Sequence, residues 1–496
     1  MKTVIGIDNG TQSTKVVFYD YEKKVFAASA SSSHKLNSGD DGTREQDAVW
    51  WIDALKNCMA QIDPGIKKTA VAAGVSGQQH GFVPLDEDGN VLYAVKLWCD
   101  TSTAAQCRKL TDIYGGEDAL LKDAGNLILP GYTLPKIIWL KEKHPELYSR
   151  LATIMLPHDY LNFYLTGSRK MEYGDASGSA LLDIRTRAWS GALLDKIDGD
   201  GTIRKALPEL IEADQFVGTV KAETAKELGI PEGIPVSSGG GDNMMGAWGT
   251  GTVVEGVMTM SLGTSGTMYG YSDSPVIDPN GNLAAFCSSS GGWLPLLCTM
   301  NCTVSTTLMG GLFDLNVKEI DRLAEEAPAG SEGLINLPFY NGERTPNLPN
   351  GKGCLLGMNM TNVTKQNIIR SSMEAAIFGM KIGLESFQEL GFNAKEIRLI
   401  GGGANSAPWR QIAADILELP VVVPKLQEAA AFGAALQAYW ALSSANGQKL
   451  SPASIAEEHV ELKEGCAAVP GKNSAKYKPV YAAYQSYLKA LSGLFK

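Results

Sequence analysis

Two segments in opposite halves of the chain share one pattern, and this internal repeat limits the fold more than any other feature. Residues 4–20, VIGIDNGTQSTKVVFYD, align without a gap on residues 257–273, VMTMSLGTSGTMYGYSD, with five of the 17 positions identical. Each copy contains an apolar strand, a Gly-Thr turn rich in hydroxyls and a second strand, which is the pattern of a β-hairpin. A hairpin at the start of each half predicts two lobes of similar architecture.

Strand and helix patterns alternate around both hairpins. In the first half, apolar residues at helical spacing over 45–61 precede a buried strand over 69–77 that ends in glycine. In the second half, a long helix over 366–390 precedes a strand over 397–403 and a helix over 406–417. Because strands and helices alternate in both halves, the sequence predicts an α/β fold with buried sheets.

Composition places the lobe boundary and narrows the function classes. Glycine accounts for 54 of 496 residues, above the usual ~7%, and many lie in 237–256, so we divide the chain into lobes at 1–245 and 246–496. The net charge of −10 provides no general field for nucleic acid or anionic membrane. No segment reads as a signal peptide or a bilayer span, so we expect a soluble cytoplasmic protein.

Both hairpin turns have the composition of a phosphate site. In the first turn Gly10 permits close approach of the backbone to a ligand, Asp8 can hold Mg²⁺ through water and Lys15 can neutralise charge. The second turn, 261–267, has similar hydroxyls but no carboxylate at the equivalent position. Two turns facing one cleft could hold a polyphosphate from both sides, while the alternative for each is an ordinary polar hairpin turn.

Two glycine-rich turns follow probable strands. Asp242, after Gly239 to Gly241, lies where α/β proteins place ligands and could accept a proton from a hydroxyl; the alternative is a helix N-cap. The segment 401–406 follows a strand and opens a helix, which is a suitable place to bind a nucleoside or a phosphate. The alternative is a plain strand-to-helix turn. Neither a P-loop nor a Rossmann glycine motif occurs in the sequence, so a nucleotide would be held by the hairpins and these turns.

The order and spacing of seven motifs point to a known family. They are GIDNGTQSTK at 6–15, GVSGQQHG at 74–81, LPHDYLNFYLTG at 156–167, GGGDN at 239–243, SLGTSG at 261–266, GERTP at 342–346 and LIGGGANSAPWRQIAADIL at 399–417. Together they resemble the FGGY carbohydrate kinases, which share a superfamily with heat-shock chaperones and actin. The resemblance extends over nearly the whole chain.

This resemblance implies a fold, a reaction and cofactors. The fold would be α/β with two actin-like (ribonuclease H-like) lobes, each a mixed sheet flanked by helices, with nucleotide and sugar in the cleft between them. The reaction would be ATP-dependent phosphorylation of a sugar hydroxyl, with ATP and Mg²⁺ as cofactors. Lobe 1–245 would bind the sugar and carry the Mg²⁺ and phosphate hairpin, while lobe 246–496 would bind the nucleotide.

The matched motifs also imply roles for individual residues. Asp242 would be the general base, Asp8 would organise Mg²⁺, and the sugar would contact Gln79, His80, Trp98, Asp242 and Asn243. The residues implied to bind the phosphates, adenine and ribose are Thr11, Ser13, Lys15, Gly263, Thr264, Gly402, Gly403 and Asn405.

The substrate implied by the resemblance is a ketose. SGQQHG, the run 98–100 and the segments 125–140 and 173–183 are similar to the branch of the family that phosphorylates D-xylulose to D-xylulose 5-phosphate. Kinases of L-ribulose, gluconate or another polyol stay open, as does a non-kinase ATPase of the actin or chaperone type. The sequence does not decide between a monomer and a homodimer, and it predicts no nucleic-acid or membrane partner.

Some residues keep two interpretations. Trp98 and Tyr132 could pack on the sugar or fill the lobe core, and Asp175 could form hydrogen bonds in the substrate region. We expect Arg344 to stabilise its loop by pairing with a carboxylate, and we expect His158 to be structural or to lie at the surface.

Overall fold

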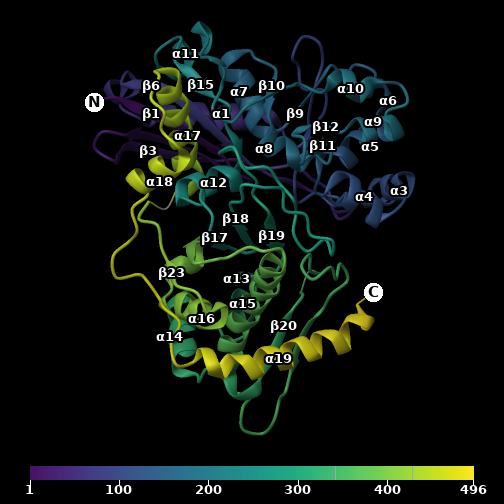
Figure 1. Ribbon diagram of the computed structural model, residues 1–496, viewed down its shortest axis with the longest axis vertical. Helices are drawn as coiled ribbons and strands as arrows, with labels where there is room; N and C mark the ends of the chain where they lie inside the picture. Colours follow the sequence, from purple (N-terminus) through teal and green to yellow (C-terminus); the bar gives the residue numbers. More distant parts are fainter. Residues whose placement is uncertain (341, 427, 496) are drawn as a thin grey trace.

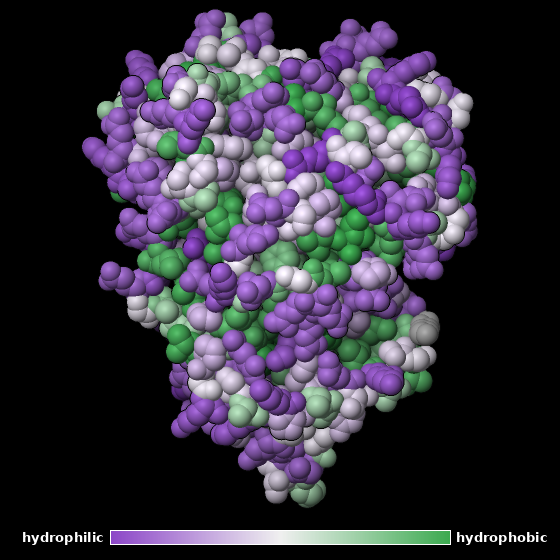
Figure 2. Space-filling view, in the orientation of Figure 1, coloured by the Kyte–Doolittle hydropathy of each residue, from purple (hydrophilic) through white to green (hydrophobic). Residues whose placement is uncertain are grey.

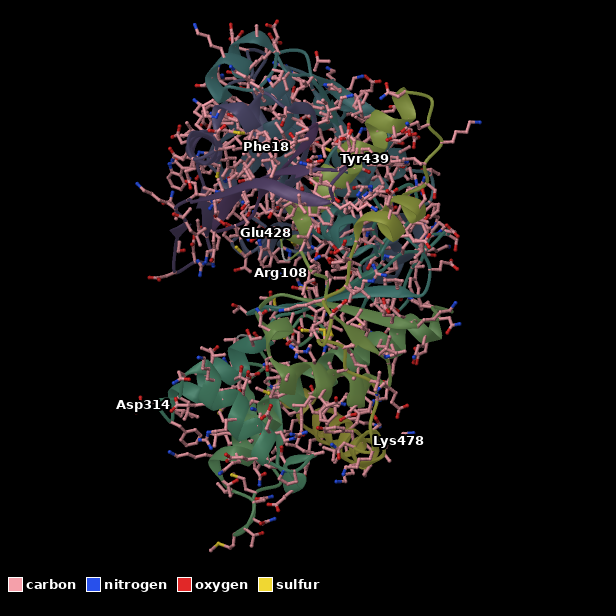
Figure 3. All side chains as sticks on the ribbon, turned by 90° about the vertical axis from the view of Figure 1, so that its left-hand side faces the viewer. Phe18, Arg108, Asp314, Glu428, Tyr439 and Lys478 are labelled. Carbon is pink, nitrogen blue, oxygen red and sulfur yellow. The ribbon has the colours of Figure 1, made fainter. Side chains whose placement is uncertain are left out.

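The chain forms two bodies joined at a waist (Figure 1). The structure is a computed structural model that describes residues 1–340, 342–426 and 428–495. Phe18 and Tyr439 lie in one body and Asp314 and Lys478 in the other (Figure 3). Tyr439, from the second half of the chain, therefore packs in the same body as the N-terminal residues. Polar side chains cover most of the face shown in Figure 2, and apolar side chains gather mainly around the waist.

The first body is built on a seven-stranded mixed sheet. Its order is β14-β15-β6-β1-β2-β3, and β16 also pairs with β6. β1 is antiparallel to β2 and parallel to β6, and β2 is antiparallel to β3. The strands are β1 (Thr3–Asn9), β2 (Ser13–Asp20), β3 (Val25–Ser33), β6 (Ala70–Gly77), β14 (Phe216–Thr219), β15 (Pro235–Ser237) and β16 (Gly240–Gly241).

The second body repeats the same pairing in a five-stranded sheet of order β19-β18-β17-β22-β23. β17 is antiparallel to β18 and parallel to β22, and β18 is antiparallel to β19. Both hairpins predicted from the internal repeat are therefore confirmed, and each occupies the same place in its sheet. The strands are β17 (Val257–Leu262), β18 (Gly266–Gly270), β19 (Leu296–Thr299), β22 (Glu396–Ile400) and β23 (Val421–Val422).

The main predicted helices form within a few residues of their expected bounds. α1 (Ala48–Ala60) packs on β2 and β3, and α15 (Lys365–Glu389) packs against α13 (Thr303–Gly311), α14 (Val317–Glu326) and α16 (Ala407–Leu417). The C-terminal helix α19 (Ser474–Leu491) contacts α16. Apolar residues of α15, α16 and the second sheet share one buried cluster, because all three elements turn their apolar sides inward.

A long excursion between β6 and β14 adds a helical layer beside the first sheet. A separate apolar cluster, which includes Leu134, Ile137 and Leu193, holds it together. Its helices are α3 (Ala104–Tyr114), α4 (Glu117–Ala124), α5 (Thr133–Lys143), α6 (Pro145–Tyr148), α7 (Pro157–Thr166), α8 (Tyr173–Ala176), α9 (Gly191–Ile197) and α10 (Thr202–Ala206).

Two helices from different halves cross through glycines beside the first sheet. α12 (Asp242–Thr250) contacts α17 (Ala429–Ala445), and a Cβ on Gly433 would lie 1.7 Å from Met245 O. α17 also lies directly on the sheet, where a Cβ on Gly6 of β1 would lie 1.8 Å from Ala431 O. At both contacts, α17 with α12 and α17 with β1, the backbones approach so closely that glycine is required.

We expect Gly433→Ala to destabilise the protein because the added methyl group overlaps the Met245 carbonyl. The free energy of unfolding should fall by about 2 kcal/mol, since overpacking costs more than the helix propensity of alanine returns. Urea denaturation followed by circular dichroism measures this change.

Gly311→Ala is the matched control, because no described atom lies within 4 Å of a Cβ placed on this helical glycine. Its stability should be equal to or above that of the wild type. Equal stability of the two variants would contradict the glycine crossing.

Candidate active site

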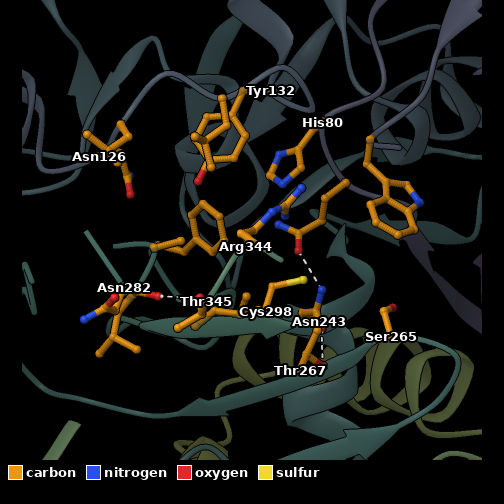
Figure 4. Close-up of a pocket in the computed structure, with 18 of the residues that line it drawn as sticks. His80, Asn126, Tyr132, Asn243, Ser265, Thr267, Asn282, Cys298, Arg344 and Thr345 are labelled. Carbon is orange, nitrogen blue, oxygen red and sulfur yellow. Dashed lines mark hydrogen bonds between the residues drawn. The ribbon is translucent and has the colours of Figure 1, made fainter. Parts of the chain in front are cut away.

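A cavity of about 280 Å³ opens at the waist, between the ends of the two sheets (Figure 4). Both halves of the chain line it. The first half contributes Gln79, His80, Trp98, Asn126, Tyr132, Asp242 and Asn243, and the second half contributes Ser261, Gly263, Ser265, Thr267, Asn282, Phe286, Cys298, Arg344 and Thr345, among others.

The polar floor of the cavity is a short hydrogen-bond chain. Asn243 Nδ2 donates to Gln79 Oε1 at 2.8 Å and to Asp242 Oδ1 at 3.1 Å. The Asn243 backbone N–H also donates to Asp242 Oδ1, at 2.8 Å. α12 begins at Asp242 and its N-cap is Gly241, so the cap interpretation of Asp242 is wrong. Asp242 instead lines the cavity.

Strand order brings a second carboxylate to the same edge of the first sheet. β1 and β16 pair with β6 on either side, with Asp8 opposite Ser76 and Gly241 opposite Gly77. Asp8 and Asp242 therefore both lie at the carboxyl ends of parallel strands, the usual ligand position in such sheets. Asp8 Oδ1 accepts a hydrogen bond of 2.8 Å from Ser76 Oγ.

The proximity of these carboxylates changes their proton affinity. Desolvation by the surrounding protein and the negative charges of Asp8 and Asp175 raise the pKa of Asp242 to about 7. Desolvation also raises the pKa of Asp8 to about 6, although the bond from Ser76 and the charge of Lys15 oppose the shift. Burying like charges together in this way is typical of functional sites and unfavourable for stability alone.

His80 is held firmly against the cavity wall. Its backbone has φ of 65°, and its carbonyl accepts a bond of 2.7 Å from the buried Lys136 Nζ. The ring packs on Tyr132 and Phe286, with centroids 4.7 and 5.7 Å away. Burial, together with the charges of Lys136 and Arg344, holds the pKa of His80 well below its usual value, so the imidazole is neutral.

The first hairpin touches the cavity through Trp98. Trp98 Nε1 donates to Thr11 Oγ1 at 2.9 Å, which links the cavity wall to the predicted phosphate turn. Lys15 Nζ forms an ion pair of 2.6 Å with Glu428, which lies near the waist in Figure 3. Ser13 lies at the start of β2, in the same hairpin.

The second hairpin meets the other glycine-rich turn. A Cβ on Gly403 would lie 2.7 Å from Leu262 Cβ, so this turn packs beside Gly263 of the cavity wall. Thr264 follows in the hairpin, and Gly402, Gly403 and Asn405 form a short 3-10 helix before α16. These residues lie outside the cavity lining but next to it, in the second body.

The structure brings several residues into the cavity that were not singled out as ligands from the sequence. Asn126 lies in the motif segment 125–140, whereas Asn282 and Cys298 carry no motif signal and only the folded chain identifies them. The predicted pairing of Arg344 with a carboxylate is wrong, because no carboxylate among residues 1–340, 342–426 and 428–495 forms an ion pair with Arg344. It points into the cavity instead (Figure 4).

A buried charged cluster lies directly behind Gln79. His158 Nδ1 and Asp175 Oδ2 are 2.6 Å apart, and His158 Nε2 lies 2.9 Å from Asp159 Oδ1. Burial opposes the charge on His158, but the two carboxylates outweigh it and raise the pKa of His158 well above its usual value. A Cβ on Gly241 would touch both Gln79 Cγ, at 2.6 Å, and Asp175 Oδ1, at 2.9 Å, so this cluster abuts the residue before Asp242.

Comparison with known proteins identifies the family. Residues 3–249 match the N-terminal domain, and residues 258–442 the C-terminal domain, of the FGGY family of carbohydrate kinases. The chain belongs to this family. It is therefore a phosphotransferase with an alcohol group of a small-molecule sugar as acceptor, and family membership implies ATP as the donor, generally with Mg²⁺.

Individual relatives agree with this assignment. A protein named xylulose kinase from Haemophilus influenzae is 42% identical, covering 99% of this chain and all of the relative, and one from Bacillus subtilis is 32% identical over 98% and 96%. Among solved structures, a xyloylose kinase from Brucella ovis shares the fold with a TM-score of 0.91 and 27% identity, and the match covers 99% of this chain and 100% of that one. A gluconate kinase from Lactobacillus acidophilus shares it with a TM-score of 0.91 and 25% identity, and the match covers 100% of this chain and 99% of that one. The two bodies are thus the two actin-like lobes predicted from the sequence. No helix among the described residues is long and apolar enough to cross a membrane.

We expect His158→Ala to destabilise the protein strongly, because it leaves the Asp159 and Asp175 carboxylates buried without a cation. Removing one partner of a buried ion pair costs about 3–5 kcal/mol in the free energy of unfolding. Guanidinium denaturation at neutral pH measures it. His144→Ala is the control, since that ring is partly exposed and its closest carboxylate atom is 3.7 Å away; equally small losses in both variants would show that the buried cluster is uncharged.

Proposed function

We propose that this chain transfers the γ-phosphoryl group of ATP to D-xylulose and forms D-xylulose 5-phosphate. The observation that carries the proposal is the chain of Gln79, Asn243 and Asp242 on the floor of a cavity that both lobes line. The 42% identity to a kinase named xylulose kinase supports the choice of sugar over gluconate or another polyol.

Asp242 is the proposed general base. Its carboxylate faces the cavity, and a pKa of about 7 is close to the value at which a base is both deprotonated and able to accept a proton. Because phosphoryl transfer has a loose transition state, Asp242 takes the proton late, and the protein mainly orients the reactants. Asn243 holds the carboxylate in place, and His80 and Trp98 would contact the sugar.

The hairpins are the proposed phosphate site. Thr11, Ser13 and Lys15 would bind phosphate oxygens from one side, and Gly263 and Thr264 from the other. Lys15 can exchange Glu428 for a phosphate, because both side chains of that pair are more than a third exposed and such pairs are weak.

Asp8 and the glycine turn complete the proposed nucleotide site. Asp8 fits Mg²⁺ because one carboxylate plus phosphate oxygens is a common magnesium environment, and the ion would neutralise charge on the phosphates. Gly402, Gly403 and Asn405 would support adenine and ribose. We place the lobe boundary at residues 245 and 246, with α17 returning to the first sheet.

We expect Asp242→Ala to lower kcat at least ~10²-fold, because the acceptor hydroxyl loses its base. Nucleotide affinity should stay within about twofold of the wild type, since general-base loss acts on the chemical step. A coupled assay gives kcat, and isothermal titration calorimetry with a non-hydrolysable ATP analogue gives the affinity. Turnover near the wild-type value would remove Asp242 from this role.

A substrate panel tests the choice of sugar. We expect D-xylulose to give the highest kcat/KM among D-xylulose, L-ribulose, gluconate, glycerol and xylitol in an ADP-release assay. The rate without sugar is the control, because water competes with the acceptor hydroxyl. No rise with D-xylulose above that rate, with a rise for another compound, would reassign the substrate. No rise with any sugar would favour an ATPase of the actin or chaperone type.

A further inference from the structure

One arginine from the second lobe enters the part of the cavity formed by the first lobe. Arg344 lies on the loop 342–346, between β20 (Ile335–Pro338) and β21 (Gly353–Leu356). Its side chain points into the cavity toward His80 and Tyr132 (Figure 4). A Cβ on Gly131, next to Tyr132, would lie 3.8 Å from Arg344 Nη2, which confirms that the guanidinium reaches the first lobe.

The loop holds Arg344 from both sides. The carboxylate of Glu343 accepts bonds from the N–H groups of Met300 and Arg344 and from Asn301 Nδ2, at 2.5, 2.8 and 3.0 Å. On the other side Thr345 Oγ1 donates to the Asn282 carbonyl at 3.2 Å. Anchors on the residues immediately before and after Arg344 limit the positions that its side chain can take, as expected of a binding group.

The guanidinium has no oxygen acceptor among the described residues. The guanidinium bonds the Cys298 thiol. Its charge adds to the burial that lowers the pKa of His80, and it opposes the burial that raises the pKa values of Tyr132 and Cys298. An arginine carries five N–H donors in a planar fork, and half-buried donors without acceptors are unfavourable. A ligand with neighbouring oxygen atoms would satisfy them.

Arg344 and Asp242 lie at different parts of the cavity. Asp242 lies beside Asn243, which donates to Gln79 Oε1 at 2.8 Å, whereas Arg344 lies against the wall formed by His80 and Tyr132, with its Nη2 3.8 Å from a Cβ placed on Gly131. Cys298 lies between Arg344 and Asn243 in Figure 4. A sugar whose reacting hydroxyl meets Asp242 would extend its other end toward this wall. In an open-chain 2-ketose that end carries a carbonyl oxygen next to a terminal hydroxyl, two acceptors that a guanidinium fork can reach together.

We propose that Arg344 binds the carbonyl end of the ketose and is a specificity-determining residue of this kinase. The inference rests on the proposed function, because it takes a ketose as the substrate. Arg344 then links the lobes through the substrate, since its loop belongs to the second lobe and its neighbours His80 and Tyr132 to the first. A neutral His80 beside it can bond the sugar without repelling the guanidinium.

The proposal is tested with Arg344→Met and Arg344→Lys. Methionine removes the fork and the charge at similar length, and lysine keeps only the charge. We expect KM for D-xylulose to rise at least ~10-fold in Arg344→Met and less in Arg344→Lys, as for loss of a charged hydrogen bond. The affinity for a non-hydrolysable ATP analogue should remain within about twofold.

A reduced sugar isolates the carbonyl contact. D-Arabinitol has the same carbon skeleton with the carbonyl reduced to an alcohol, so we measure it as a competitive inhibitor against D-xylulose. Arg344→Met should raise its inhibition constant by a smaller factor than the KM for D-xylulose. Equal factors would overturn the assignment to the carbonyl, and an unchanged KM would overturn the role in sugar binding. A parallel loss of ATP-analogue affinity would also overturn it, because Arg344 would then bind phosphate.

Two controls separate the possible failures. Arg322→Met removes an exposed arginine of the same lobe, whose partner is Glu326, and should leave every constant unchanged. Urea denaturation of Arg344→Met shows whether the variant folds, and Arg344→Lys replaces it if it does not. Wild-type inactivity toward D-xylulose refutes the proposed function, whereas an active wild type with an unaffected Arg344→Met refutes this inference alone.

Discussion

The rest of the structure depends on the direct backbone contact between α12, α17 and the first sheet. Gly433 meets Met245 and Gly6 meets Ala431 with no room for a side chain. This contact returns residues 429–445 from the second half of the chain to the first sheet, so the first body is built from segments of both halves. α12 begins with Asp242, and the crossing therefore also fixes the position of the catalytic carboxylate proposed here.

Around this junction the protein gathers negative charge. Burial and the nearby charges of Asp8 and Asp175 raise the pKa of Asp242. Glu172 is also buried, and burial raises its pKa to about 7. A stable core would avoid this arrangement, because buried like charges destabilise the folded state. Cations beside these carboxylates include His158, inside the cluster, and Lys15, at its edge. Bound ligands can supply the remaining positive charge, which agrees with a kinase that generally uses Mg²⁺.

Much of the fold and part of the site were predictable because their signals are local. The repeat over 4–20 and 257–273 predicted both hairpins, and glycines marked the strand ends beside Asp242 and before Ser406. The sequence signalled neither the glycine crossing at Gly433 nor the pairing of His158 with Asp175, because each depends on residues that are distant along the chain. Arg344 was predicted to pair with a carboxylate, and only the arrangement of the lobes shows that it points into the cavity.

The sequence by itself determined the alternation of strands and helices, the duplicated hairpins and the family, because these follow from short-range patterns of apolar residues, glycines and hydroxyls. Only the tertiary structure decided which side chains share the cavity and what charge each carries. Asp242 has a pKa near 7, and His80 is neutral, because of burial and neighbours that come from other segments of the chain. Desolvation and Coulomb interactions depend on distances in space, which a linear pattern does not contain.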